Sequence, residues 1–228
     1  MNTALHEAIL MIFSGNRLLG SIIGVTVRMS LASSLTALLL GVPLGVWLGS
    51  GRFAARKTLV VLNRTFMGTP PVVCGLLCYL LFSGVGPLRM LKLLYTVRGM
   101  VIAQILLITP IIAGMMESCV SSVAPAVKET AGGMGLSGGK TLLLIMNESR
   151  YQIISTYLMG LSRALAEVGA VSMVGGAIAY KTNVMTTAIM NYTNMGNFTT
   201  SLALGIILFF ISLAVNIAVS LLQGRLAI

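Results

Sequence analysis

Long apolar runs without a charge dominate this sequence and limit what it can fold into. Residues 29–48 form one run of twenty residues, and residues 201–222 form another of twenty-two. A helix that spans the hydrocarbon core of a bilayer needs about 20 mostly apolar residues. Only 9% of the 228 residues are charged, against roughly a quarter in ordinary soluble domains. These features exclude a water-soluble globular enzyme and predict an all-α polytopic membrane protein.

About five transmembrane helices are predicted, all within a single domain that covers residues 1–228. The predicted spans are residues 29–48, 66–82, 99–116, 151–180 and 201–222. Residues 1–27 are a weaker stretch, for which we expect an interfacial lead-in helix, with a sixth span as the alternative. The longest connection, residues 121–150, is rich in Gly and Ser and is expected to be a cytoplasmic loop.

The charges favour a membrane protein over a nucleic-acid-binding protein. The chain has 15 Lys and Arg against five acidic residues, a net charge of +10, and its cations are scattered between apolar runs. Short cytoplasmic loops are enriched in Lys and Arg, and residues 49–58 contain Arg52, Arg56 and Lys57. We therefore expect the N-terminus outside and the C-terminus inside the cell. Glu117 is expected at a helix end, facing the cytoplasm.

No catalytic residue, metal site or cofactor is predicted in this chain. All five acidic residues are Glu, and His6 is the only histidine, so most hydrolytic triads and metal cages cannot be built. Cys74 and Cys78 lie four residues apart in an apolar stretch and are interpreted as small buried side chains rather than as zinc ligands. The Gly-rich residues 132–141 imitate nucleotide-binding and nucleophile-elbow motifs but lack the strand and the acidic or histidine partners that those motifs need.

Small residues and prolines indicate how the helices pack. The glycines with a four-residue spacing are Gly41, Gly45 and Gly49, and separately Gly20 and Gly24. This spacing lets helix backbones approach closely in lipid, but it does not identify the partner helix. Pro70 and Pro71 lie inside a predicted span, where each removes a backbone hydrogen bond. They are candidates for the wall of a permeation pathway, with an ordinary structural kink as the alternative.

Arg163 and Glu167 are the charges that stand out within a predicted span. Their i, i+4 spacing places them on one helical face, and a charge at the bilayer centre costs roughly 2.5–3.5 kcal/mol on insertion scales. Each must therefore meet a partner or water. One interpretation is an ion pair that locks helices together. The other is that both residues border a permeation pathway, where Arg163 attracts an anion and Glu167 holds Arg163 in place.

One segment resembles a known motif. Glu129, Thr130 and Ala131, followed by Gly135 and then by Ile145, follow the spacing E-A-A-x3-G-x9-I, which resembles the cytoplasmic loop motif of ABC-transporter permeases. The resemblance implies that residues 129–131 form a short coupling helix, ended by Gly135, which sits in a cleft of the ATP-binding subunit. The sequence departs from the family pattern at Thr130, and at Asn147 and Glu148, where Leu-Pro is usual.

A second resemblance indicates which kind of ABC-transporter permease this sequence is most similar to. Residues 162–170 resemble the Arg-x3-Glu-x-Gly-Ala segment of oxyanion permeases, the molybdate, tungstate and sulfate group, and Pro70-Pro71 with the residues after them resemble that group's second span. Residues 174–189 look most like the tungstate-importer permeases. The similarity runs from about residue 25 to residue 222 and implies the fold of a type I ABC importer permease.

The resemblance also implies function and partners. It describes the non-catalytic permease subunit of an ATP-driven importer, with tungstate as the expected oxyanion and molybdate or sulfate as the alternatives. The expected partners are a second copy of this chain, two copies of an ATPase that carries ATP and magnesium, an extracytoplasmic oxyanion-binding protein and the lipid of the cell membrane; no nucleic acid is expected. The rivals are a self-sufficient secondary anion carrier, which would need carboxylates in the membrane, and an intramembrane enzyme.

Overall fold

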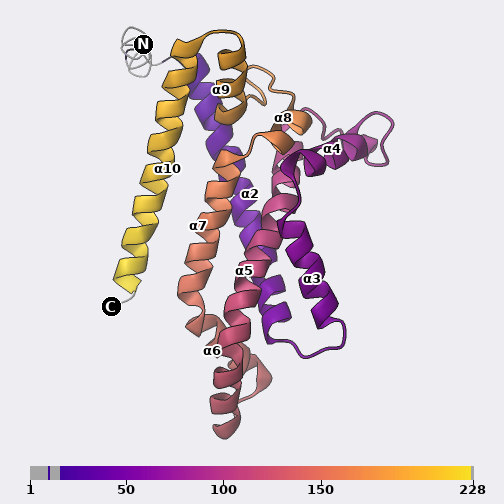
Figure 1. The fold of residues 1–228 in the computed structure, drawn as a ribbon, viewed down its shortest axis with the longest axis vertical. Coiled ribbons are helices and arrows are strands. Elements are labelled where there is room, and N and C mark those ends of the chain that lie inside the picture. The colour runs from indigo at the N-terminus through magenta and orange to yellow at the C-terminus, as the bar shows by residue number, and fades with distance from the viewer. Residues whose placement is uncertain (1–9, 11–15, 227–228) are drawn as a thin grey trace.

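Two long helices, α2 (Arg17–Ser50) and α5 (Val97–Gly133), pack together along the centre of the molecule (Figure 1). The structure is a computed structural model that describes residue 10 and residues 16–226. The other helices are α3 (Arg56–Met67), α4 (Pro71–Phe82), the 3-10 turn η1 (Arg89–Leu91), α6 (Gly138–Glu148), α7 (Arg150–Ala166), α8 (Gly169–Gly175), α9 (Met185–Asn194) and α10 (Phe198–Leu226). The described part of the chain contains no strand, so the predicted all-α class is confirmed.

Three described helices are long and apolar enough to cross a membrane: α2, α5 and α10. They contain the predicted spans 29–48, 99–116 and 201–222. The other two predicted spans fall on bent helix pairs in the same part of the chain. Helices α3 and α4 meet at 96°, and α7 and α8 meet at 56°. Counting each bent pair as one span gives the predicted five.

The predicted span over residues 66–82 is broken at its prolines, more sharply than the kink expected there from the sequence. Pro70 is extended, with φ −61° and ψ 131°, and Pro71 is the first residue of α4. A residue before proline avoids the α region because the proline ring clashes with its backbone. Two successive prolines therefore end α3 and start α4 in a new direction. They form a break between helices rather than a kink inside one.

The separate lead-in helix over residues 1–27 also needs correction. Residues 17–27 are the first turns of α2, which continues without interruption to Ser50. The helix starts there because the side chain of Asn16 accepts a hydrogen bond from the N–H of Leu18 at 2.9 Å, as N-cap residues do. Residues 1–9 and 11–15 lie outside the described part of the chain.

Glycines set the close approach of α2 to α5. A methyl group added at Gly45 would lie 2.5 Å from the carbonyl oxygen of Ala113, and one at Gly41 would lie 2.6 Å from Cγ2 of Ile112. These glycines therefore face α5, which confirms that their spacing marks a helix-packing surface. By contrast, a methyl group at Gly20 or Gly24 would meet nothing within 4 Å. These two glycines make no close helix contact in the described chain.

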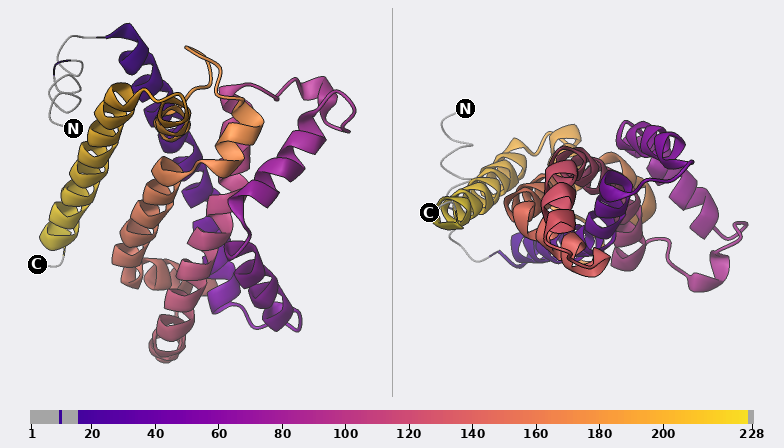
Figure 2. Two further views of the ribbon diagram at one scale, coloured as in Figure 1. Left: turned by 45° about the horizontal axis from the view of Figure 1, so that its top comes forward. Right: turned by 90° about the horizontal axis from the view of Figure 1, so that it is seen from below.

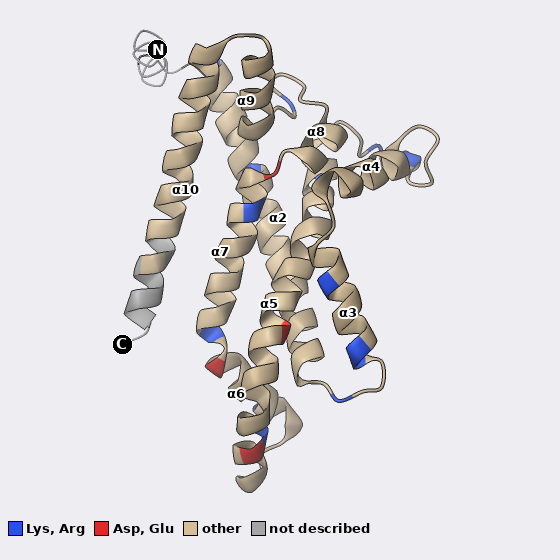
Figure 3. Cartoon of the chain, in the orientation of Figure 1, with Lys and Arg blue, Asp and Glu red and all other residues tan. Residues whose placement is uncertain are grey.

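The ends of the helices sort into two groups (Figures 1 and 2). The α2–α3 connection, α6 and the end of α10 lie at one end of the bundle, which we call the α6 end. The start of α2, the α4–α5 connection and α9 lie toward the other end. Figure 3 shows few charged segments along the helices between these ends. Residues 49–58 and 121–150 thus share one side of the molecule, as the charge argument requires.

Candidate functional site

Helix α5 ends at a glycine turn inside the predicted motif. Gly135 has a left-handed φ of +63°, and the N–H of Leu136 donates to the carbonyl of Ala131 at 2.9 Å, while the N–H of Gly135 donates to Gly132 at 3.1 Å. This is the Schellman arrangement that closes helix ends. The expectation that Gly135 ends a helix in left-handed geometry is confirmed.

The short helix at the α6 end is not where the sequence predicted it. Glu129, Thr130 and Ala131 belong to the last turns of α5, and the separate short helix is α6, which begins after Ser137. Within residues 121–150, only residues 134–137 and Ser149 lie outside the helices, so this connection is mostly helical rather than the predicted Gly- and Ser-rich loop. Gly and Ser residues indicated a loop, but packing of α6 against α5 keeps both segments helical.

Helix α6 buries one side and exposes a broad apolar surface. Ile145 and Ala131 are each 1% exposed and lie where α6 meets α5. Leu136 is half-buried, and five further apolar side chains of this region are exposed: Met134 67%, Leu142 42%, Leu143 69%, Leu144 39% and Met146 37%. We call these five residues the tip surface. Contiguous exposed apolar side chains at the end of a bundle mark an interaction site.

The predicted motif residues flank the tip surface in different ways. Glu129 and Thr130 are exposed, Gly135 is exposed at the turn, and Ala131 is buried beneath them. Thr130 also lines a cavity of about 290 Å³ between α5 and α6, together with Leu144 and Glu148. The structure therefore brings the four motif residues to one tip, with Ala131 acting as a packing residue rather than a contact residue.

Arg163 and Glu167 form an ion pair, but not on one continuous helix. Their closest atoms, Nη2 and Oε2, are 3.6 Å apart. Helix α7 ends at Ala166, and Glu167 is extended, with ψ 129°, so the prediction of a shared helical face was wrong. Oε1 of Glu167 accepts a hydrogen bond from the N–H of Ala170 at 3.1 Å. The carboxylate thus satisfies a free N–H in the first turn of α8.

Gln104 supports the same helix break and was not singled out from the sequence. Its side chain is buried, and its Nε2 donates to the carbonyl of Ala164 at 2.9 Å, one of the carbonyls left free where α7 ends. Its Oε1 accepts from the hydroxyl of Ser33 at 2.6 Å. The sequence feature that could have identified Gln104 is that it carries the one side-chain amide in the apolar run 99–116.

The proline break and the Glu167 break lie close together. Helix α4, which begins at Pro71, packs on α8: a methyl group added at Gly75 would lie 2.6 Å from Cα of Ala170. One at Gly169 would lie 2.9 Å from Cγ2 of Val72. The structure therefore brings the candidate pathway residues Pro70, Pro71 and Glu167 into one region, where two interrupted helices meet.

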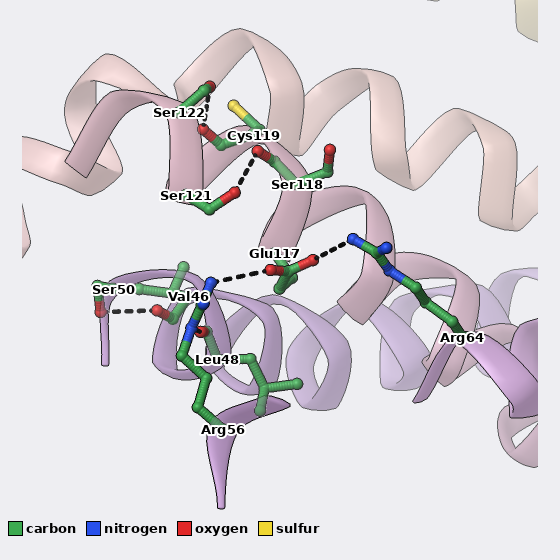
Figure 4. A network of polar contacts seen from close by, with 10 residues as sticks. All are labelled: Val46, Leu48, Ser50, Arg56, Arg64, Glu117, Ser118, Cys119, Ser121 and Ser122. Atoms are coloured by element: carbon green, nitrogen blue, oxygen red, sulfur yellow. Dashed lines mark hydrogen bonds and ion pairs between the residues drawn. The ribbon is translucent and has the colours of Figure 1, made fainter. Parts of the chain in front are cut away.

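Glu117 does not face the cytoplasm at a helix end, as the sequence prediction had it. It lies in the middle of α5, and its side chain is 6% exposed. Figure 4 shows two arginines from α3 that reach it, Arg56 at 3.1 Å and Arg64 at 3.4 Å. The buried carboxylate therefore holds α3 against α5. Its two partners are far away in sequence, so helix periodicity could not reveal them.

We expect Glu117→Gln to lower the free energy of unfolding by about 1–2 kcal/mol. An amide leaves two adjacent guanidinium groups without a counter-charge, but the exposure of their side chains, 31% and 65%, reduces the loss through solvent screening. Thermal unfolding in detergent measures the change. Glu148→Gln is the matched control, because Glu148 is exposed and forms no salt bridge among the described residues. Equal shifts for both variants would contradict this role.

The described residues contain no group of three or more His, Cys, Asp or Glu side chains able to hold a metal ion. Cys74 and Cys78 are free and buried and pack with Phe82, Leu107 and Val174 in one apolar cluster. The interpretation of these cysteines as small buried side chains is confirmed.

Comparison with known proteins gives consistent matches. The sequence matches the family described as "Binding-protein-dependent transport system inner membrane component" over residues 41–228. A "Probable anion ABC transporter permease protein" from Haloferax volcanii is 34% identical over 201 residues, covering 86% of this chain and 87% of the relative. A "Tungstate uptake system permease protein TupB" from Peptoclostridium acidaminophilum is 31% identical over 203 residues, covering 89% of each protein.

The fold is also similar to a solved structure. A chain of the MetNI methionine ABC transporter, in an inward-facing conformation, superposes with a TM-score of 0.76 at 17% sequence identity. The match covers 91% of this chain and 95% of that chain. At this identity the likeness concerns the fold alone.

Proposed function

Since this chain belongs to the family of binding-protein-dependent transport system inner membrane components, we propose that it is the permease subunit of an ATP-driven importer for tungstate. Its spans would form the route through the membrane, and ATP hydrolysis would occur in a separate subunit. The choice of tungstate over molybdate or sulfate rests on the tungstate relative, which is 31% identical over 89% of this chain.

The observation that carries the proposal is the tip surface at the α6 end. An apolar helix held outside the apolar spans needs a protein partner, because its exposed leucines would otherwise face water. We propose that an ATPase subunit covers it and that Glu129 and Thr130 contact the rim of the same site. The tip surface would then lie in the cytoplasm with the C-terminus, and the start of α2 would lie outside.

Two copies of this chain would form the pathway, each bound to one ATPase subunit. Five spans are too few to enclose a polar route alone, and a twofold pair is the commonest closed assembly. An extracytoplasmic binding protein would deliver the oxyanion and supply most of the selectivity. A permease site that held the ion tightly would slow its release, because the ligand must leave the state that receives it.

Reconstitution into lipid vesicles tests this function. Vesicles that contain the permease, the ATPase and the binding protein are expected to accumulate tungstate when ATP is supplied. Vesicles that contain the permease alone are expected to show no tungstate uptake. Tungstate, molybdate and sulfate are supplied at equal concentration, and uptake of each is measured. Uptake by the permease alone would identify a secondary carrier, and a preference for molybdate or sulfate would overturn the assignment of tungstate.

We further propose that Arg163 borders the route of the anion. Its side chain is 39% exposed while that of Glu167 is 4% exposed, so the carboxylate can hold a guanidinium that stays accessible. A charge-assisted contact to the passing dianion is then available at Arg163. It would be transient, because Glu167 competes for the same donors.

Arg163→Ala is expected to lower ATP-driven tungstate uptake by about tenfold, which corresponds to the loss of one charge-assisted hydrogen bond. Glu167→Ala is expected to lower it further, because α8 also loses a hydrogen bond at its first turn. Vesicle uptake is measured for both variants and for the double variant, with Arg150→Ala as the control at the exposed start of α7. Normal transport by the double variant would show that the pair has no role in permeation.

A further inference from the structure

A pocket lined by three cations lies where α2 ends. Its volume is about 340 Å³, and it is bounded by the end of α2, the start of α3 and the later part of α5. Its charged lining residues are Arg52, Arg56 and Lys128, and no acidic residue of the described chain lines it. Ser50 and Lys128 also line an adjoining pocket that reaches Leu142 of the tip surface, whereas no residue of the helix breaks lines this pocket.

Two of the three cations, Arg56 and Lys128, are held in place without being fully neutralised. Nε of Arg56 donates to the carbonyl of Leu48 at 2.7 Å, and Nζ of Lys128 donates to the carbonyl of Ser50. Carbonyl oxygens orient a cation but carry no net charge. Arg56 also pairs with Glu117, whereas Arg52 and Lys128 form no salt bridge within the described residues.

The cations of the pocket keep N–H donors that could form hydrogen bonds to a ligand. A guanidinium has five N–H donors and an ammonium has three. Arg56 uses donors on two of its nitrogens, and Lys128 uses one donor. A tetrahedral oxyanion such as a phosphate group could accept hydrogen bonds from the rest, and the net positive charge of the lining attracts it.

Aromatic and apolar neighbours indicate the depth of this pocket in the membrane. Trp47 and Phe53 stack beside it with ring centroids 4.6 Å apart, and Trp47 is 51% exposed. Tryptophan side chains gather at the level of the lipid headgroups. Along the two adjoining helices, Leu44 is 37% exposed and Val61 is 63% exposed. Two of the helices that bound the pocket thus carry exposed apolar side chains one to two turns from its lining residues.

We propose that this pocket binds the phosphate of an anionic membrane lipid. Basic pockets between membrane helices recognise anionic headgroups, and the aromatic pair and the apolar neighbours favour a lipid over free phosphate. The bound phosphate would join α2, α3 and α5 at one point. Because Lys128 directly precedes Glu129, the lipid would stabilise the last turns of α5, against which α6 with its tip surface packs. This proposal does not depend on which anion is transported.

The test compares lipid retention by the purified full-length chain in native mass spectrometry. Detergent-solubilised protein is titrated with phosphatidylglycerol or with phosphatidylcholine, which has a neutral headgroup. The double variant Arg52→Gln, Lys128→Gln is expected to bind phosphatidylglycerol about 25-fold more weakly, since each cation near an anionic headgroup contributes about fivefold. Binding of phosphatidylcholine should stay the same. Arg89→Gln, Lys92→Gln is the matched control, because it removes the same charges from the α4–α5 connection.

Further variants and a competition experiment distinguish a specific lipid site from non-specific attraction by net charge and from a site for free phosphate. Lys128→Arg keeps the charge and should keep lipid binding, and unchanged thermal unfolding midpoints would show that the variants are folded. Equal loss in the control variant would mean that net charge alone attracts the lipid, and retention by the double variant would overturn the site. Displacement of phosphatidylglycerol by millimolar inorganic phosphate would assign the pocket to a free oxyanion instead.

Discussion

Leu143→Glu is expected to abolish ATP-driven uptake while the helical bundle stays folded. Leu143 is 69% exposed on α6, so the substitution changes no buried contact within this chain. In the proposed complex the carboxylate would be buried against the ATPase without a partner, which is strongly unfavourable. Loss of a central apolar contact at an interface costs about 2 kcal/mol or more, a roughly thirtyfold weaker association. Co-purification with the ATPase and vesicle uptake measure the two effects.

The control for this variant is Val85→Glu. Val85 is 93% exposed and lies in the connection between α4 and α5, toward the other end of the bundle. The same change of charge and polarity there should leave ATPase binding intact. If Leu143→Glu binds the ATPase as well as the parent chain does, the tip surface is not the docking site, and the proposed coupling role fails.

Gly45→Val is expected to lower the free energy of unfolding by about 3 kcal/mol, at the upper end of the usual cost of overpacking. Even a single methyl group at this position would lie 2.5 Å from both the carbonyl oxygen of Ala113 and Cβ of Met116. The obstacle is the backbone of α5, which no rotamer change can remove. Helices α2 and α5 would have to separate along the centre of the bundle. The midpoint of thermal unfolding in detergent measures the loss.

Gly24→Val is the matched control for the glycine surface. Gly24 lies on the same helix, but a methyl group there meets nothing within 4 Å, so unfolding should change by less than about 0.5 kcal/mol, as for most surface substitutions. Similar losses at Gly24 and Gly45 would show that helix propensity, rather than the approach of α5, determines the effect.

At the α6 end, the sequence motif predicted the end of a helix but not the position of the short helix. The spacing of Glu129 and Gly135 correctly located a helix end, because a left-handed turn there needs glycine. It did not locate the short helix, because the Gly and Ser residues around α6 suggested a loop. The burial of Ile145 against α5, a contact between segments, keeps α6 helical.

For the candidate pathway, too, the sequence identified the important residues but not the local structure that holds them. Arg163 and Glu167 stood out because charges in an apolar span are costly, and the structure confirms that they pair. Periodicity placed them on one helix, since nothing in the local sequence requires α7 to end at Ala166. The break is supported by side chains from elsewhere, with Gln104 bonding to the carbonyl of Ala164.

The sequence by itself determined the all-helical membrane class, the approximate positions of the spans and the glycine surface of α2, because these follow from hydropathy and from local residue spacing. Only the tertiary structure decided where two of the spans break, which helix faces Gly45 and why Glu117 is buried. Each of these depends on residues distant in the chain, such as Arg64 of α3 reaching Glu117 of α5. Such pairings are set by which helices become neighbours, and no local pattern records that.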